Sequence, residues 1–382
     1  MLSESYRYQG QTVAFMLKFI RSEFALILGY IVTALAYGPG SFLFAGEFSL
    51  PLFLALFAAL FIVMLLLSFS AVRHADHLAE LLGEPYGTLI LTIAVITIEV
   101  ALISAIMLSG DAAPTLARDT MMAVLMIVMN GVVGIVLLVG GFHHSEQEYN
   151  LRGAVAFLTV LVTLATMTLI LPNFTESTPD PSLNRIQSEW FALITIVLYA
   201  TFLAIQTVRH RSFFVQPGRE DGDEEHHDVS GSGSVQYHAV LLVLTLIPAV
   251  LLSKKLAVLV DFGIGTWSLP VALGGIVIAS LVLAPEALAA FHSARQNYLQ
   301  RAVNICLGSA LATIGLTVPA VLVISIYSGQ EIQLGVGNTD MTLLLLTMFV
   351  SALTFGGVRT NMLQGAVHLV IFLVYLVLIF NP

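Results

Sequence analysis

The sequence predicts an all-α integral membrane protein with about eleven transmembrane helices, and three observations support this class. Apolar residues make up 58% of the 382 residues and charged residues only 10%, whereas soluble domains average about 25% charged residues. Apolar runs of roughly 20 residues recur along the chain, each long enough to cross the hydrocarbon core as a helix. These runs lack the alternation of lipid-facing and lumen-facing residues that a transmembrane barrel requires.

Eleven apolar stretches flanked by polar residues are the expected spans. They cover residues 24–38, 49–72, 86–109, 120–141, 153–172, 189–208, 237–260, 268–290, 302–327, 341–357 and 364–380. Between the sixth and seventh lies the acidic run 219–228, followed by the Ser/Gly run 230–234, and this composition predicts a flexible linker. The chain is therefore divided into an N-terminal segment with the first span (1–40), a first five-helix repeat (41–210), an acidic linker (211–236) and a second five-helix repeat (237–382).

The odd number of spans in each repeat predicts that the two repeats insert with opposite topology, as in many transporters. An inverted repeat also predicts matching sites in matching spans. Eleven of the fifteen Lys and Arg residues fall in the segments on the same side as the N-terminus. The positive-inside rule then predicts a cytoplasmic N-terminus, a cytoplasmic linker and an exterior C-terminus.

Two glutamates meet the expectation of matching sites. Glu99 is the lone charge of the third span, Glu286 is the lone charge of the eighth, and five spans separate them. A charge at the bilayer centre costs about 2.5–3.5 kcal/mol on insertion scales, so such a residue usually has a partner or a function. Pro285 is expected to kink or open the helix beside Glu286, because proline removes a backbone donor and clashes with the preceding turn.

Three further residues are candidate cation ligands. Asn130 lies in the fourth span, and Ser309 and Thr313 lie in the ninth, which follows the second glutamate. Carboxylate, amide and hydroxyl oxygens suit hard cations such as Ca²⁺ or Na⁺. Small polar residues also pack helices together, which explains these three equally well. Glu84, at the start of the third span, is either part of an access funnel or a solvated helix end.

Other titratable groups fall mostly in expected loops. The groups 74–77 and 143–148 contain histidines and carboxylates that either sense pH or Ca²⁺ or are simply solvated. His368, inside the last span, is expected to pack or to form an interhelical hydrogen bond.

Two segments resemble a known family. Residues 82–89 (LGEPYGTL), continuing to Glu99, resemble the first repeat of ChaA-type calcium(sodium, potassium)/proton antiporters. Residues 284–288 (APEAL), continuing through 295–301 (RQNYLQR) to Gly308-Ser309-Ala310, resemble the second. These proteins form part of the cation/proton exchanger branch of the calcium:cation antiporter superfamily. The resemblance implies that Glu99 and Glu286 bind cation and protons alternately, and it implies a bacterial inner membrane. Many relatives carry Gly-Asn shortly before each glutamate, where this chain has Val95-Ile96 and Val282-Leu283.

The sequence therefore predicts a secondary antiporter that exchanges Ca²⁺, with Na⁺ or K⁺ as further substrates, for H⁺. A monovalent Na⁺(K⁺)/H⁺ antiporter using the same site is the alternative, and a passive channel is a third possibility. An intramembrane enzyme is disfavoured because the sequence has no His-Glu-x-x-His motif and no paired intramembrane aspartates. We expect no catalytic residues, no cofactor and no nucleic-acid partner; inorganic cations, protons and lipid are the expected partners. The oligomeric state stays open.

Overall fold

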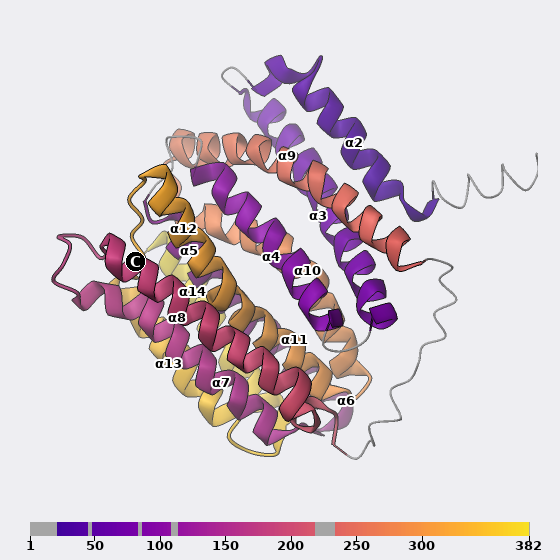
Figure 1. Ribbon diagram of the computed structural model, residues 1–382, viewed down its shortest axis with the longest axis vertical. Coiled ribbons are helices and arrows are strands. Elements are labelled where there is room, and N and C mark those ends of the chain that lie inside the picture. Colours follow the sequence, from indigo (N-terminus) through magenta and orange to yellow (C-terminus); the bar gives the residue numbers. More distant parts are fainter. Residues whose placement is uncertain (1–20, 45–47, 83–85, 108–113, 218–233, 382) are drawn as a thin grey trace, which may run out of the picture.

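The computed structural model describes residues 21–44, 48–82, 86–107, 114–217 and 234–381. Helices account for nearly all of this part of the chain (Figure 1). The first half contains α2 (Phe24–Tyr37), η1 (Ser41–Phe44), α3 (Leu50–Leu82), α4 (Tyr86–Met107), α5 (Leu116–Met126), η2 (Ile127–Val132), α6 (Val133–His144), α7 (Leu151–Ala165), η3 (Thr166–Ile170), η4 (Leu171–Phe174), α8 (Arg185–Ala204), η5 (Ile205–Arg209) and η6 (Arg211–Phe214). The second half contains α9 (Val235–Trp267), α10 (Ala272–Arg295), α11 (Leu299–Ala312), η7 (Thr313–Thr317), α12 (Val318–Ser328), α13 (Asn338–Thr354) and α14 (Met362–Phe380).

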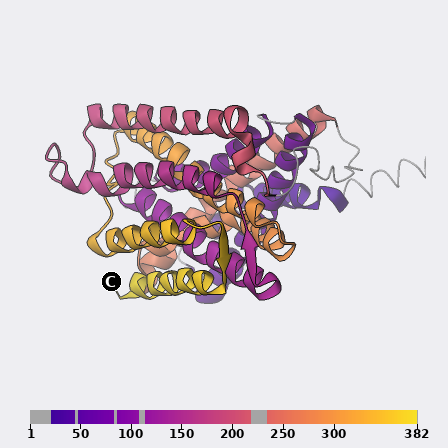
Figure 2. The same ribbon diagram turned by 90° about the horizontal axis from the view of Figure 1, so that it is seen from below.

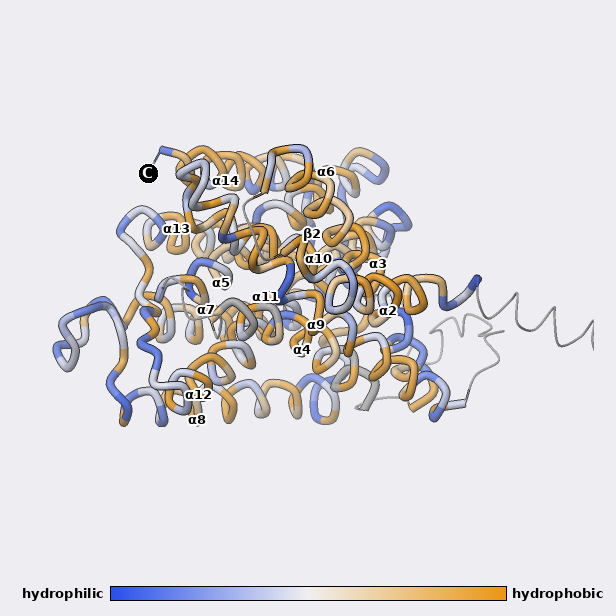
Figure 3. Tube along the Cα trace, turned by 90° about the horizontal axis from the view of Figure 1, so that it is seen from above, coloured by the Kyte–Doolittle hydropathy of each residue, from blue (hydrophilic) through white to orange (hydrophobic). Residues whose placement is uncertain are grey.

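The described helices have the length and polarity of membrane spans. Eight of them are long and apolar enough to cross a bilayer, and shorter apolar helices cover Phe24–Tyr37, Thr92–Ala101 and Asn338–Thr354. Hydrophobic residues occupy the helices, and hydrophilic residues gather at the helix ends and connections (Figure 3). The predicted class of all-helical membrane protein is confirmed, whereas the count of eleven spans stays a prediction.

The second expected span is longer than its apolar stretch. We expected it to end at residue 72 and residues 74–77 to lie in a loop, but α3 continues to Leu82. The polar extension is stabilised because His74, Ala75 and Leu78 are buried against neighbouring helices. The extension therefore brings polar side chains of α3 into the folded protein.

Two hydrophobic clusters meet along the helices that carry the glutamates. One cluster is built from buried residues of α2, α3 and α9 and reaches one side of α4 and α10, and the other combines α5–α8 with α11–α14. Figures 1 and 2 show the first group set beside the second. In α4, Val95 and Ile98 belong to the first cluster and Ile96 and Ile103 to the second. The α4/α10 pair thus forms a seam between two packed bodies.

Two short backbone pairings link the halves of the chain. Strand β1 (Glu146–Glu148), between α6 and α7, pairs antiparallel with β2 (Arg359–Asn361), between α13 and α14. An antiparallel bridge joins Ser182, before α8, to Gln333, between α12 and α13. If α3–α8 and α9–α14 are equivalent repeats, the α6–α7 connection corresponds to the α12–α13 connection, and the α7–α8 connection corresponds to the α13–α14 connection. Each pairing then joins the same two connections, with the first and second halves of the chain exchanged. Similarly, π-helical turns interrupt the third helix of each half at η2 and η7.

A candidate transport site

A cavity of about 420 Å³ lies at the seam between the two packed bodies. Both glutamates line it, Glu99 from α4 and Glu286 from α10. Residues of α11 and η7, among them Ser309 and Thr313, form another wall, and Tyr199 of α8 contributes as well. The structure thus brings together four of the five predicted ligands from segments far apart in the sequence.

The carboxylate of Glu99 is almost completely buried, with 1% of the residue exposed. The Oγ1 hydroxyl of Thr313 donates a hydrogen bond to its Oε2 atom at 3.1 Å. Thr313 is the first residue of the π-helical turn η7, and π-helical turns in α-helices frequently mark functional sites. The hydrogen bond therefore joins the glutamate of one half to the helix interruption of the other.

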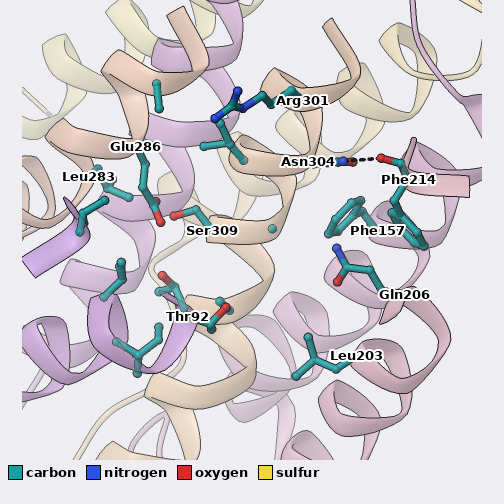
Figure 4. A pocket seen from close by; sticks show the side chains of 18 of the residues that line it. Thr92, Phe157, Leu203, Gln206, Phe214, Leu283, Glu286, Arg301, Asn304 and Ser309 are labelled. Atoms are coloured by element: carbon teal, nitrogen blue, oxygen red, sulfur yellow. Dashed lines mark hydrogen bonds between the residues drawn. The ribbon is translucent and has the colours of Figure 1, made fainter. Parts of the chain in front are cut away.

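Glu286 occupies the facing wall. Its side chain and that of Ser309 point toward one another (Figure 4). Helix α10 continues through Pro285 without being unwound, so the expected opening of the helix at this residue does not occur. Pro285 is buried, and packing of α10 against neighbouring helices holds the helix together at this residue.

Each glutamate keeps one buried oxygen without a hydrogen-bond partner. Within the described part of the chain, Oε1 of Glu99 and Oε2 of Glu286 are both of this kind. A buried polar atom without a partner is costly and calls for an explanation. Two such oxygens in one cavity are suitable positions for a bound cation or for protons.

The cavity extends from the glutamates toward one end of the molecule. Beyond the glutamates it is lined by Asp76 near the end of α3, Arg211 of η6 and Arg301 near the start of α11. These three residues lie at the end of the molecule where η6, the first part of the acidic linker, follows η5. We call this end the linker side. Asp76 and Arg301 are exposed, and Figure 4 shows Arg301 beyond Glu286 and Ser309. The linker side is therefore the mouth of the cavity.

At the opposite end, α5 and α10 pack closely. A Cβ atom added to Gly275 of α10 would lie 2.9 Å from the backbone carbon and oxygen of Asp119 and from Cα of Thr120. These two backbones therefore approach at a distance that a side chain would prevent. This close contact lies at the end of α10 away from the linker side.

Comparison with known proteins identifies the family. The profile of the family described as sodium/calcium exchanger protein matches residues 52–208 and 237–381, one segment in each half. The chain belongs to this family. It is 40% identical over 341 residues to the sodium-potassium/proton antiporter ChaA of Escherichia coli (strain K12), covering 89% of this chain and 92% of that protein.

Two further comparisons extend this result. The exchanger is 24% identical to the Ca²⁺/H⁺ antiporter ChaA of Bacillus subtilis (strain 168) over 246 residues, covering 64% of this chain and 69% of the other. Its fold is similar to that of native YfkE, with a TM-score of 0.70 at 18% identity, over 95% of this chain and 99% of that one. The predicted family resemblance is thus confirmed.

The fifth predicted ligand of the exchanger lies elsewhere. Asn130 is fully buried in η2 and is not among the residues lining the cavity. Its Nδ2 atom donates to Oγ1 of Thr347 at 2.8 Å, and its Oδ1 lies 3.0 Å from Nδ1 of His368. His368 also contacts Oγ1 of Thr354 at 3.0 Å, which confirms the expected interhelical hydrogen bonding. Because α13 and α14 occupy its amide group, we do not include Asn130 among the ligands.

The remaining candidates either stay predictions or form ion pairs outside the cavity. Glu84 and the acidic run 219–228 lie outside the described residues. Glu146 and Glu148 lie in β1, where both form ion pairs with Arg359. The hydrogen bonds that Arg359 donates to the Glu148 carboxylate raise the pKa of the Arg359 guanidinium.

Sequence reasoning missed several cavity residues, including Asp76, Tyr199 and Arg301. Asp76 was considered only as part of an expected loop. Arg301 was noted only as the last residue of the RQNYLQR motif and not as a site residue, and Tyr199 carried no signal beyond its residue type. The proximity of both residues to the glutamates depends on long-range packing.

Proposed function

We propose that the exchanger is a secondary antiporter that exchanges Ca²⁺ for H⁺ across the membrane by alternating access, with Glu99 and Glu286 binding the cation or protons in competition. The observation that supports this most strongly is the pair of partnerless buried oxygens on the two glutamates, which face one cavity at the seam. Such a pair needs a positive charge, and a cation or protons can each supply it.

Coupling follows from the chemistry of the two carboxylates. When both are ionised they repel one another, and the protein around them cannot solvate them as water does. A divalent cation neutralises both charges at once, and two protons do the same. If the two packed bodies move relative to one another, and so change the side to which the site opens, only when the pair is neutralised, each cation moved one way requires protons to move the other way.

The ligands that the site offers are all oxygens. Carboxylates of Glu99 and Glu286 with hydroxyls of Ser309 and Thr313 suit Ca²⁺, which accepts six to eight oxygen ligands. The same atoms suit Na⁺ or K⁺, and the name of the 40% identical relative from Escherichia coli favours a monovalent Na⁺(K⁺)/H⁺ antiporter as the second candidate. The name of the Bacillus subtilis relative favours Ca²⁺.

The proposal includes an orientation. The excess of Lys and Arg on the N-terminal side of the eleven expected spans supports a cytoplasmic N-terminus and linker, with an exterior C-terminus. The linker-side mouth then opens to the cytoplasm, and the α5–α10 contact closes the exterior path. The counterpart pairings of β1 with β2 and of Ser182 with Gln333 support two inverted five-helix repeats. A bacterial inner membrane fits this arrangement.

Proton flux in proteoliposomes tests the proposal. Ca²⁺, Na⁺ and K⁺ are added in turn to the wild type and to Glu99→Gln and Glu286→Gln, while a pH-sensitive dye reports the internal pH. Cation-triggered proton movement that both substitutions abolish is the expected result, and the ranking of the three ions identifies the substrate. Cation movement without proton movement would indicate a channel and would contradict antiport. Normal exchange in either variant would disprove the shared site.

A further inference from the structure

A second group of titratable residues lies outside the transport cavity, where α2, α3 and α9 meet at the linker side. Its centre is a pair of buried imidazoles: the Nδ1 atoms of His74 on α3 and His238 on α9 are 3.1 Å apart. His74 is 1% exposed and His238 6%. His74 also lies 3.1 Å, through Nε2, from Oε2 of Glu23 at the start of α2. One contact chain therefore connects three helices.

The surrounding charges determine where the protons lie. Arg73 forms an ion pair with Glu23 at 2.8 Å. Burial raises the pKa of the Glu23 carboxyl, but hydrogen bonding to His74 and the charge of Arg73 outweigh burial, and the pKa falls below its usual range. Glu23 is therefore ionised at neutral pH, and its Oε2 atom can accept a hydrogen bond from Nε2 of His74. At 3.1 Å, one ring of the pair donates a hydrogen bond through its Nδ1 and the other accepts it through its Nδ1.

Adding protons to this pair changes the contact in two steps. One added proton is accommodated, because a single N–H still lies between the two Nδ1 atoms and only one ring is charged. A second added proton makes both rings imidazolium, and two N–H donors then face each other at 3.1 Å. Like charges and opposed donors cannot remain in that arrangement. Double protonation must therefore separate the rings.

Among the described residues, the other titratable and charged groups facing the pair do not remove this conflict. On α3, the ring of His77 stacks against that of His238 with centroids 4.6 Å apart, and Glu80 lies 3.5 Å from Nδ1 of His77. On α9, the hydroxyl of Tyr237 lies 3.5 Å from Oε1 of Glu23. Glu80 is half-exposed and is directed to His77, and Glu23 is already shared by His74 and Arg73.

We propose that His74 and His238 form a second proton-binding site, distinct from the transport cavity, whose double protonation releases the linker-side end of α3 from α9. The consequence for transport arises from the geometry of α3. Successive residues of a helix are about 100° apart, so His74 and Asp76 lie on nearly opposite faces. One face of α3 binds α9 through His74 and the other lines the mouth of the transport cavity through Asp76. Movement of α3 therefore changes the shape and charge of the mouth.

The distance between α3 and α9 measures this release directly. Spin labels on Leu81→Cys and Gln236→Cys report it, since both side chains are exposed near the two helix ends. The buried Cys306 is replaced by alanine. The transport-site variant Glu99→Gln/Glu286→Gln serves as the background, so that its two carboxyl groups cannot titrate. In this background we expect a single short distance at about pH 8 and an additional longer distance at acid pH.

Variants then identify the groups responsible. Asparagine places an uncharged amide near the position of Nδ1, so His238→Asn and, independently, His74→Asn should each abolish the longer distance at acid pH. His292→Asn, an exposed histidine at the end of α10, is the matched control and should retain it. A pH-independent distance in the background protein would overturn the proposal, and so would an unchanged pH response in both asparagine variants. Because no transport is measured, either result leaves the antiport proposal intact.

Discussion

Gly275→Ala is expected to favour the state that is open on the side away from the linker. The added Cβ would lie 2.9 Å from three backbone atoms of α5, and backbone cannot rotate away as a side chain can. Overpacking of this kind costs about 1–3 kcal/mol. The cost applies only where α5 and α10 are in contact, that is, in the arrangement observed here. The equilibrium between the two states should therefore shift by roughly 5- to 150-fold.

Apparent affinity on the two sides of the membrane measures this shift. Binding from the linker side requires the destabilised state, so the half-saturating cation concentration on that side should rise by up to the same factor. On the other side it should fall or stay constant. Everted and right-side-out vesicles expose the two sides separately to external cation.

The neighbouring glycine provides the matched control. A Cβ at Gly274 would lie 3.2 Å from Cγ1 of Val260, a side chain that can adjust. Both substitutions gain similarly in helix propensity, so their difference isolates the contact with α5. Equal half-saturating concentrations for the two variants on both sides would refute the conclusion that this contact closes the far side.

Four further predictions concern individual contacts. Thr313→Val removes the hydroxyl that donates to Glu99. A hydrogen bond worth about 0.5–1.5 kcal/mol predicts a rise of about 2- to 13-fold in the half-saturating cation concentration. Thr313→Ser should stay near wild type, and an unaffected valine variant would exclude this hydroxyl from the site. His368→Ala leaves Asn130 and Thr354 with buried partnerless atoms and should lower the thermal unfolding temperature in detergent. The order in which Ca²⁺, Na⁺ and K⁺ are preferred in transport should not change. An altered order would contradict a structural role for His368. Asp76→Asn should slow cation uptake from the linker side at low ionic strength, because the carboxylate at the mouth no longer attracts the cation. Added salt should reduce the difference from wild type, since it screens this attraction. A defect that does not depend on salt would argue against electrostatic attraction by Asp76. Because the folded-state pKa of Glu23 is lowered, its stabilisation is fully present above the unfolded-state value of about 4.3 and is lost as the pH falls through the lower folded-state value. Glu23→Gln should therefore lower the unfolding temperature at neutral pH, and the difference from wild type should disappear once the pH is below the folded-state value of Glu23.

The sequence predicted the membrane class and both glutamates because these depend on local composition. A lone charge in an apolar span, as at Glu99 or Glu286, can be recognised from its immediate neighbours. Ser309 and Thr313 could be named as candidate ligands because they are polar residues in the span that follows the second glutamate.

Other features depend on contacts between distant segments and could not be predicted in this way. The side chain of Asn130 turns toward α13 and α14 because Thr347 and His368 are there, 217 and 238 residues further along the chain. The expected end of α3 was placed ten residues too early, since hydropathy falls where His74 and its neighbours are buried by α9. The pairing of His74 with His238 spans 164 residues and has no local signature.

Proton release on cation binding tests the central claim that one site serves both ions. Cation is added to the detergent-solubilised exchanger in weakly buffered solution, and the pH change is compared with the amount of cation bound. The account predicts that protons are released on binding, that fewer are released per bound cation in Glu99→Gln and Glu286→Gln, and that the affinity for cation falls as the pH is lowered. Tight cation binding without proton release, or release that neither substitution changes, would contradict it.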